Sequence, residues 1–287
     1  MEQLAGGRLL VRAPAKLNLS LRVGPIRPYG YHRLDSLVAK VTLYDELILS
    51  IRADGRVHLT CDQPAAGAPD DNLALRAAKL LSPHAGGLGA DITLGKHIAV
   101  GAGLGGGSSD AAAALTGLNR LWNCRLDAQR LSAMAAQLGS DVPLFLGPPA
   151  ARMTGRGEHI EPVELPAFAA VLLTPPLHCP TGEVYRAYDA IGPGPLEPLE
   201  IAALIARPAS KWPPLMTNDL LPAAERVRGE LADWRRRLAA TGEPVHLTGS
   251  GSALFVLADD VASAATIRSR LDDRTASLAR IVSLNPW

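Results

Sequence analysis

A glycine-rich stretch that runs directly into alanines constrains this chain more than any other feature. Residues 100–115 read V-G-A-G-L-G-G-G-S-S-D-A-A-A-A-L, with five glycines in seven consecutive positions. Glycine permits positive φ angles and a close approach of the backbone to a ligand. Ser108, Ser109 and Asp110 are N-capping residue types, and the alanines that follow favour a helix. The stretch therefore predicts a flexible loop that opens a helix.

Such a loop is suited to binding phosphate, because the first N–H groups of a helix have no intrahelical partner and the helix dipole is positive there. Two other glycine motifs fit less well. Gly101, Gly103 and Gly106 match the dinucleotide pattern G-x-G-x-x-G, but Asp127, at the spacing of the acidic partner, reads as the end of a loop entering a helix. The P-loop pattern fails because no lysine follows Gly106.

Composition excludes several classes of protein. The chain has 287 residues, 47% of them hydrophobic, which suits two domains or one large one. The net charge is +1 and the longest basic block is Arg235–Arg237, so neither nucleic acid nor a membrane is an expected partner. Three distant cysteines suggest neither disulfides nor a zinc site. With no leader or membrane-spanning stretch recognised, we expect a cytoplasmic protein.

Hydrophobic periodicity and turn residues predict strands before helices, followed by a second run of both, which indicates an α+β fold with two lobes. We expect a domain over 1–155 and another over 156–287, with the last strand able to return to the first domain. The predicted elements are two short strands in 8–23 interrupted at 13–15, a strand pair beginning in 37–51, helices in 70–81 and 127–138, a strand in 90–100, a short helix from Asp141, a hairpin in 150–163, a strand in 169–174, a helix from Thr181, helical structure in 218–240, two strands joined by a turn in 245–257, and a final helix and strand.

Several single residues have both a functional and a structural interpretation. Lys16 follows Ala15 in an apolar strand of a chain with only five lysines, so its ammonium could steady a phosphate or a carboxylate, or it could be an edge-strand lysine. Lys96 could add charge near a phosphate or be solvated. Asp141 could act chemically or only cap a helix. Tyr31 and His32 could form a flat recognition surface or pack in the ordinary way.

Three motifs occur in one order along the chain: P-A-K-L-N-L-S-L with G-Y-H shortly after it, the glycine stretch, and L-T-G-S-G-S-A-L-F near the end. Together they resemble the GHMP small-molecule kinases, over Val11 to Phe255. The combination of P-A-K-L-N-L, R-P-x-G-Y-H and G-S-D-V-P-L-F-L resembles the branch that acts on a cytidine diphosphate conjugate of methylerythritol.

The resemblance implies ATP-dependent transfer of the γ-phosphoryl group to a tertiary hydroxyl of the methylerythritol moiety, with Mg²⁺ as counter-ion and its ligands unknown. Asp141 matches the base that takes the hydroxyl proton, and Lys16 is expected near it, where an ammonium favours the ionised carboxylate. The expected ATP-binding residues are Lys96, Gly101, Gly103, Leu104, Gly105, Gly106, Gly107, Ser108, Ser109 and Asp110.

On the substrate side, the family pattern implies that aromatic rings and a histidine bind the cytosine. The expected substrate-binding residues are Asn18 for the polyol, Tyr31, His32 and Tyr185 for the base, and Gly249, Ser250 and Gly251 beside the transferred group. Two positions depart from the pattern: Tyr29 replaces an aspartate, and Asp110 stands where asparagine is frequent. An acid near ATP phosphates is tolerable there only if it faces the ribose or the metal.

Two other functions remain open. Another GHMP kinase, for mevalonate, homoserine or a sugar, would have no base to stack on G-Y-H. A nucleotide-binding module without catalysis would not need Lys16 and Asp141, and both are present. The expected partner is a small cytidyl diphosphate substrate, and the expected assembly is a monomer or a weak homodimer.

Overall fold

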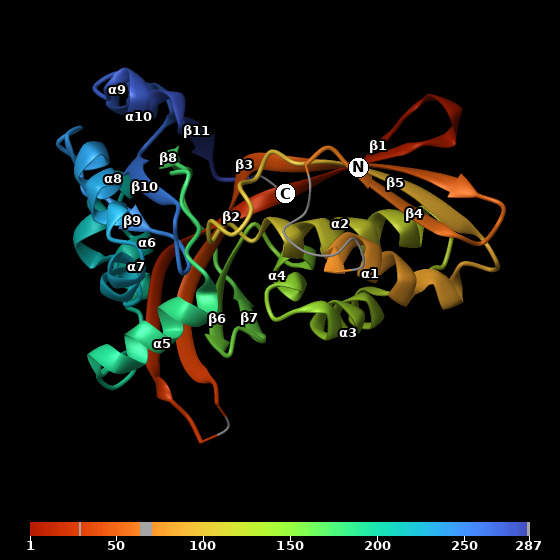
Figure 1. The fold of residues 1–287 in the computed structure, drawn as a ribbon, viewed down its shortest axis with the longest axis horizontal. Coiled ribbons are helices and arrows are strands. Elements are labelled where there is room, and N and C mark those ends of the chain that lie inside the picture. The colour runs from red at the N-terminus through yellow and green to blue at the C-terminus, as the bar shows by residue number, and fades with distance from the viewer. Residues whose placement is uncertain (29, 64–70, 286–287) are drawn as a thin grey trace. The chain divides into compact units, whose positions relative to one another are not determined.

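The computed structural model describes residues 1–28, 30–63 and 71–285, and it divides into two compact units (Figure 1). The first unit comprises residues 1–15, 43–100 and 105–148, and the second comprises 16–42, 101–104 and 149–287. Strands β2 (Leu9–Ile26) and β3 (His32–Arg52) supply residues to both units. The sequence-based domains 1–155 and 156–287 are continuous, so they differ from these units and stay a prediction of functional domains.

In the first unit, helices pack on one face of a sheet (Figure 1). Besides the ends of β2 and β3 that belong to it, the sheet contains β1, β4 and β5; β5 is antiparallel to β3, with Glu46 opposite Gly95, and parallel to β4. The bounds are β1 Glu2–Gln3, β4 Val57–Cys61, β5 Gly89–Gly95, α1 Leu73–Leu81, α2 Gly106–Leu121, α3 Ala128–Leu138 and α4 Val142–Leu146.

Helix α2 is central to this unit because small residues let it approach the sheet closely. Ala111, Leu115, Leu118 and Trp122 recur at helical spacing and are all buried, as expected for a helix that packs one apolar face on the sheet. Gly117 lies so near β3 that a β-carbon there would overlap Leu49 Cδ1. The helix is therefore held rigidly, and with it the end of the glycine loop.

The second unit contains a hairpin paired with β3 and a separate antiparallel sheet in the order β11-β8-β10-β9. Its last strand pairs with β8, and Leu284, just beyond it, bridges to Val41 on β3. The bounds are β6 Ala150–Gly155, β7 His159–Pro162, β8 Ala169–Leu173, α5 Thr181–Ile191, α6 Ile201–Ile205, α7 Leu221–Val227, α8 Glu230–Ala239, β9 His246–Leu247, β10 Leu254–Ala258, α9 Val261–Arg268, α10 Asp273–Ser277 and β11 Ala279–Ser283.

Two predicted strand boundaries are wrong. The expected break at residues 13–15 does not exist, because β2 continues through Pro14. Strand β1 pairs with β2 only at Leu9 and Leu10. At Pro14 there is therefore no β1 residue that would have to accept a hydrogen bond from the N–H that proline lacks. Likewise the apolar stretch in 37–51 lies within one 21-residue strand, β3. No helix among the described residues is long and apolar enough to cross a bilayer.

Candidate active site

The first half of the glycine loop is held against two other sequence motifs within the second unit. Lys16 donates its backbone N–H to Leu104 O (2.9 Å), and Ala253 donates its own to Ala102 O (3.0 Å). Gly103 has a φ of +81°, and a β-carbon there would overlap Thr248 O. Glycine at 103 is thus required by the backbone angle and by the neighbouring turn.

The Lys16 side chain lies at the centre of this arrangement. Its ammonium donates to Asn18 Oδ1, and Asn18 in turn donates its Nδ2 to Ser36 Oγ (2.8 Å). A β-carbon on Gly249 would lie 3.3 Å from Lys16 Nζ. Lys16 is 6% exposed, so the interpretation as a solvated edge-strand lysine is wrong.

The T-G-S-G-S turn completes this part of the site. Thr248 Oγ1 accepts the backbone N–H of Asn18 (2.9 Å), and Asn218 Nδ2 donates to Gly249 O (2.9 Å). Ser250 Oγ lies 3.0 Å from Thr181 Oγ1. The structure thereby brings together the regions of three motifs that are distant in sequence. Sequence reasoning missed Ser36, Thr248 and Asn218, because a lone hydroxyl or amide residue gives no pattern.

The second half of the loop opens α2 in the first unit. Gly105 takes the N-cap position with a φ of +71°, and the helix begins at Gly106. Ser108, Ser109 and Asp110 therefore lie inside the helix, and their predicted capping role is wrong because a left-handed glycine ends the loop instead. The N–H groups of this first turn have no intrahelical partner, and exposed Gly107 leaves them accessible.

The two serines differ in what they offer a ligand. Ser108 is half-buried, whereas Ser109 is 1% exposed. Ser109 Oγ has no hydrogen-bond partner among the residues that the structure describes. Ser108 is therefore the more accessible of the two hydroxyls in the first turn of α2.

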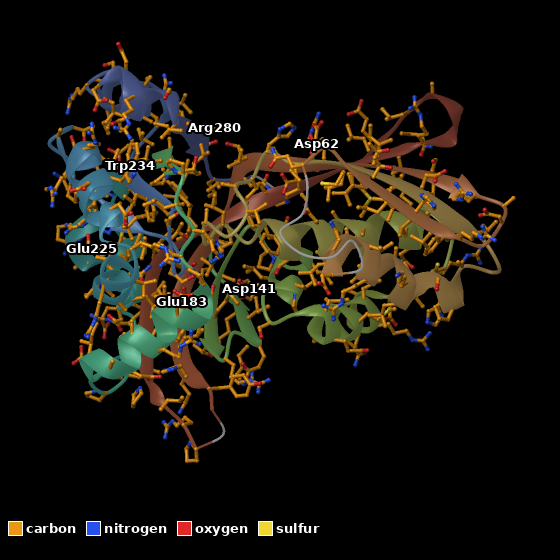
Figure 2. The ribbon with its side chains drawn as sticks, in the orientation of Figure 1. Asp62, Asp141, Glu183, Glu225, Trp234 and Arg280 are labelled. Carbon is orange, nitrogen blue, oxygen red and sulfur yellow. The ribbon has the colours of Figure 1, made fainter. Side chains whose placement is uncertain are left out.

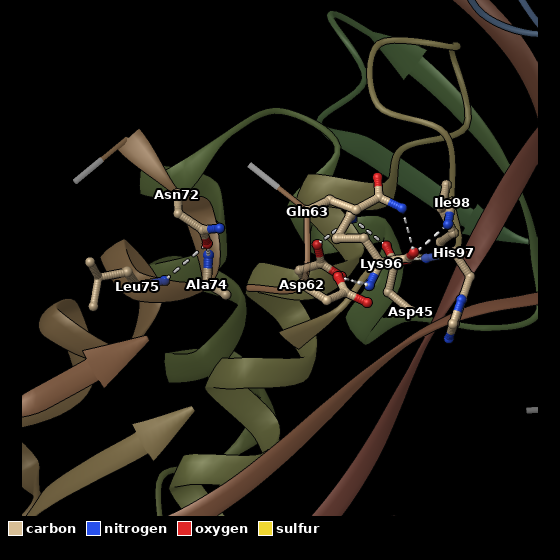
Figure 3. A network of polar contacts seen from close by, with 10 residues as sticks. Asp45, Asp62, Gln63, Asn72, Ala74, Leu75, Lys96, His97 and Ile98 are labelled. Carbon is tan, nitrogen blue, oxygen red and sulfur yellow. Dashed lines mark hydrogen bonds and ion pairs between the residues drawn. The ribbon is translucent and has the colours of Figure 1, made fainter. Parts of the chain in front are cut away.

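A buried ion-pair network joins the base of the loop to α2 (Figure 3). Lys96 Nζ donates to Asp45 Oδ2 and to Asp110 Oδ2, the latter at 2.7 Å. Asp45 is fully buried and also accepts the N–H groups of His97 (2.5 Å) and Ile98 (2.8 Å). We call these groups the Lys96 network. Lys96 is 8% exposed, so the alternative of a solvated lysine is wrong.

The strand end beside the network is held in the same way. Asp62 Oδ1 accepts the N–H of Lys96 (2.9 Å), and Gln63 Nε2 donates to Lys96 O (3.1 Å). Gly106 lies close by: a β-carbon there would be 3.3 Å from Asp45 Oδ2. The network thus fixes the polypeptide on both sides of the glycine loop.

Two carboxylates share one ammonium in this network, and the pKa values of Asp110 and Lys96 are shifted. Burial raises the pKa of Asp110 to about 7, and the negative charge of Asp45 acts in the same direction. The Lys96 ammonium lowers this pKa but offsets only part of the increase. Burial by itself would lower the pKa of Lys96, but the two carboxylates raise it. The carboxyl group of Asp110 thus faces Lys96, and its Oδ1 has no partner among the described residues.

Asp141 occupies the N-cap position of α4 (Figure 2). Its backbone is helical, and its side chain makes no capping hydrogen bond. By contrast, Asp127 Oδ1 accepts the N–H of Arg130 at the start of α3, at 2.8 Å. Asp141 is half-buried in the first unit, whereas Lys16 belongs to the second, so their approach stays a prediction.

The predicted base-binding side chains lie in the second unit. His32 donates from Nδ1 to Gly24 O (2.9 Å), and its ring centroid is 4.9 Å from that of Tyr185. Tyr31 is 56% exposed, with the Arg156 guanidinium 4.4 Å from its ring centroid. His32 and Tyr185 therefore contact each other, and a base can stack only on their outer faces. Tyr29 lies outside the described residues.

Residues 72–147 match the family model for the GHMP kinases N terminal domain. A 4-diphosphocytidyl-2-C-methyl-D-erythritol kinase from Burkholderia mallei (strain SAVP1) is 38% identical over 267 residues, which is 90% of this chain and 88% of that protein. This chain belongs to the 4-diphosphocytidyl-2-C-methyl-D-erythritol kinase family. Membership makes it an ATP-dependent small-molecule kinase.

Solved structures agree with the membership. A crystal structure of 4-(cytidine 5'-diphospho)-2C-methyl-D-erythritol kinase has 36% sequence identity and a TM-score of 0.81, covering 96% of this chain and all of that chain. The mevalonate kinase of L. major, in complex with R-mevalonate, has 15% identity and a TM-score of 0.71, covering 100% of this chain and 99% of that one. The second likeness shows that the chain has the GHMP kinase fold, an α+β architecture.

Proposed function

We propose that this chain transfers the γ-phosphoryl group of ATP to the 2-hydroxyl of 4-diphosphocytidyl-2-C-methyl-D-erythritol, a step in the non-mevalonate route to isoprenoid precursors. The observation that carries the proposal is the convergence of Lys16, Gly103 and Gly249 within the second unit. The names of the relatives at 36–38% identity support the choice of substrate.

The glycine loop supplies the binding of the phosphates. Phosphoryl transfer depends on positioning and on stabilising charge more than on covalent chemistry. The N–H groups at the start of α2 bind the phosphate oxygens, with the Ser108 hydroxyl beside them. The Lys96 network keeps these groups in place. In this arrangement Lys96 acts through Asp45 and Asp110 rather than on ATP itself.

Asp141 and Lys16 carry the chemistry in this proposal. Asp141 accepts the proton of the substrate hydroxyl as that oxygen attacks phosphorus. The Lys16 ammonium favours the ionised form of Asp141 and offsets negative charge on the transferring group. Asn18, which already accepts from Lys16, sets the direction of the ammonium and lies beside the polyol.

Mg²⁺ neutralises charge on the ATP phosphates when it is bound. The described residues contain no group of three acidic, histidine or cysteine side chains that could hold a metal by themselves. Mg²⁺ in kinases is bound largely through phosphate oxygens and water, which fits such a site. Ser109 Oγ and Asp110 Oδ1 are buried and make no hydrogen bond to the described residues. We assign no chain ligand to the ion.

The cytosine lies against Tyr31, His32 and Tyr185. Stacking on aromatic faces together with hydrogen bonds to the base edge would select cytidine conjugates over mevalonate or homoserine. The three free cysteines and the charge balance are consistent with a cytoplasmic enzyme.

The direct test measures ADP release with the cytidyl compound, mevalonate and homoserine as alternative substrates. We expect kcat/KM to be highest for the cytidyl compound, and Tyr185→Ala and Tyr31→Ala to raise its KM by about 5-fold to 150-fold, the scale of one base–aromatic contact. KM for ATP should hardly change. Equal use of mevalonate would refute the substrate assignment and leave the kinase assignment intact.

The base assignment has a matched control in Asp127. Asp141→Asn should lower kcat by about 100-fold or more, the scale of a lost general base, and should leave the melting temperature unchanged because no cap is lost. Asp127→Ala should lose about 1 kcal/mol of stability and keep its kcat, since its side chain does cap α3. Near-normal turnover of Asp141→Asn would exclude Asp141 as the base.

A further inference from the structure

His178 lies beside the glycine loop, and nothing in the sequence motifs points to it. It is an exposed residue between β8 and α5, in the same unit as Gly101–Leu104. Its ring faces the backbone of Gly101 so closely that a β-carbon on Gly101 would overlap Nδ1 and lie 2.5 Å from Cε1. The imidazole therefore lies at the first glycine of the loop that holds phosphate in the proposed function.

The backbone that carries His178 is fixed on both sides. Ser252 Oγ donates to Leu177 O (2.6 Å), and Arg228 Nε donates to His178 O (2.8 Å). The next residue, Cys179, is buried, and its Sγ would lie 3.6 Å from a β-carbon on Gly251. The ring is thus positioned by the same turn that contacts Gly103 and Lys16.

The hydrogen-bonding atoms of this side chain are its two ring nitrogens. Neither ring nitrogen of His178 makes a hydrogen bond to any residue that the structure describes. The cationic group nearby is the Arg228 guanidinium, which lies 3.6 Å from a carboxylate oxygen of Glu183. An exposed imidazole of fixed position, next to a loop of phosphate-binding type, has a hydrogen-bond donor available for an anion.

We propose that His178 donates a hydrogen bond to a phosphate oxygen of ATP at the start of the glycine loop. The proposal rests on the proposed kinase function and gives the first part of the glycine loop, at Gly101, a side-chain donor. A packing role alone would use the ring face or edge against Gly101 and would not need a nitrogen. An amide side chain of similar size could replace the hydrogen-bond donor of His178, but it could not replace the packing of the ring.

The test compares His178→Ala with His178→Asn and His178→Gln, whose amide nitrogens approximate Nδ1 and Nε2. His84→Ala, at an exposed histidine in the first unit, is the matched control. Calorimetric titration with ADP and with a non-hydrolysable ATP analogue gives the dissociation constants without turnover. Adenosine, which has no phosphate, is titrated in parallel, and thermal unfolding confirms that each variant is folded.

We expect His178→Ala to weaken binding of the ATP analogue by about tenfold, the scale of one hydrogen bond to a charged group. One of the two amide variants should recover most of the affinity, while adenosine binding, KM for the cytidyl substrate and the His84 control stay unchanged.

Unchanged analogue affinity in His178→Ala would overturn the proposal, as would an equal loss for adenosine. A rise confined to KM of the cytidyl substrate would also overturn it. Failure of the enzyme to phosphorylate the cytidyl compound would refute the proposed function instead, since the calorimetry does not need that substrate.

Discussion

Lys16 and Lys96 are both buried, with 6% and 8% of their surface exposed, yet their surroundings differ in kind. The Lys96 ammonium donates to two carboxylates, so its charge is compensated inside the first unit. The Lys16 ammonium donates to the amide of Asn18 and lies against the glycine-containing turn at Gly249. Burial alone therefore does not reveal the function of a lysine, whereas the type of group around it does.

The difference indicates how the work is divided. A compensated buried ion pair contributes little net stability but is costly to break, so the Lys96 network acts as a structural connection that is sensitive to loss of one member. The Lys16 ammonium donates to Asn18 beside the glycine loop, and the proposed mechanism places it at the transferring phosphoryl group. The predictions below test this division.

The largest effect is expected for Lys96→Met. It leaves Asp45 and Asp110 buried without the ammonium, which should lower the free energy of unfolding by about 3–5 kcal/mol in urea titration. Lys79→Met, at an exposed lysine on α1, is the matched control and should change stability by less than about 0.5 kcal/mol. If Lys96→Met is unfolded, the double variant Lys96→Met/Asp110→Asn can be measured instead, because it removes one of the two uncompensated charges. Unaltered stability with a raised KM for ATP would mean that Lys96 binds ATP directly.

Lys16→Met should have a smaller effect on the free energy of unfolding than Lys96→Met but a large effect on activity. Because Lys16 faces the reacting groups in our proposal, kcat should fall by about 100-fold or more, and stability should change less than in Lys96→Met. The measurement is single-turnover phosphoryl transfer at saturating ATP, with urea unfolding of the same samples. A variant that unfolds like Lys96→Met but keeps its kcat when folded would place Lys16 in the same structural class as Lys96.

The smallest effect is expected for Asp110→Asn and depends on pH. The pKa of Asp110 is raised from 3.8 to about 7 in the folded protein, so its contribution to stability is present at low pH and is lost as pH rises through about 7. The substitution removes this dependence. Loss of the ion pair to Lys96 offsets part of the gain, which leaves the variant more stable than the parent by on the order of 1 kcal/mol at pH 8.

The stability difference should decrease toward zero at pH 4, where Asp110 is protonated in the folded protein. Urea titrations of both proteins at pH 4, 6 and 8 measure it. A parent and variant with parallel stability curves would show that Asp110 does not titrate in this range.

Local patterns in the sequence predicted much of the fold. The buried apolar stripe of α2, the helix expected in 127–138 and the hairpin in 150–163 all appear, because each depends on neighbours in sequence. The break expected near Pro14 is absent. Whether a strand can continue through a proline depends on its neighbouring strand, and here β1 stops pairing with β2 at Leu10. Capping by Ser108 also failed, because a glycine in the left-handed conformation ends the loop without a side chain.

The glycine loop could be predicted from its own residues, and Lys16 stood out as a lysine in an apolar strand. Their roles, and that of Asp141, were predicted from the match to a family pattern. The pairing of Asp45 with Lys96 could not be predicted, because 51 residues separate an acid and a base that carry no mutual signal. The position of His178 depends in the same way on a β8–α5 loop held by residues far along the chain.

The division of the chain into interleaved segments has a consequence for its biosynthesis. All of the first unit has been made once Pro148 is added, but residues 16–42 belong to a unit that, apart from 101–104, continues only at Pro149. At about 5–20 residues per second, the ribosome takes on the order of 5–20 s to pass from Thr42 to Pro149. Leu21 and Val23 are buried in the core of the second unit. They cannot be fully packed there until that interval has passed and β11 has been made. We therefore expect the first unit to fold during translation, and the second to fold only after β11 has been made.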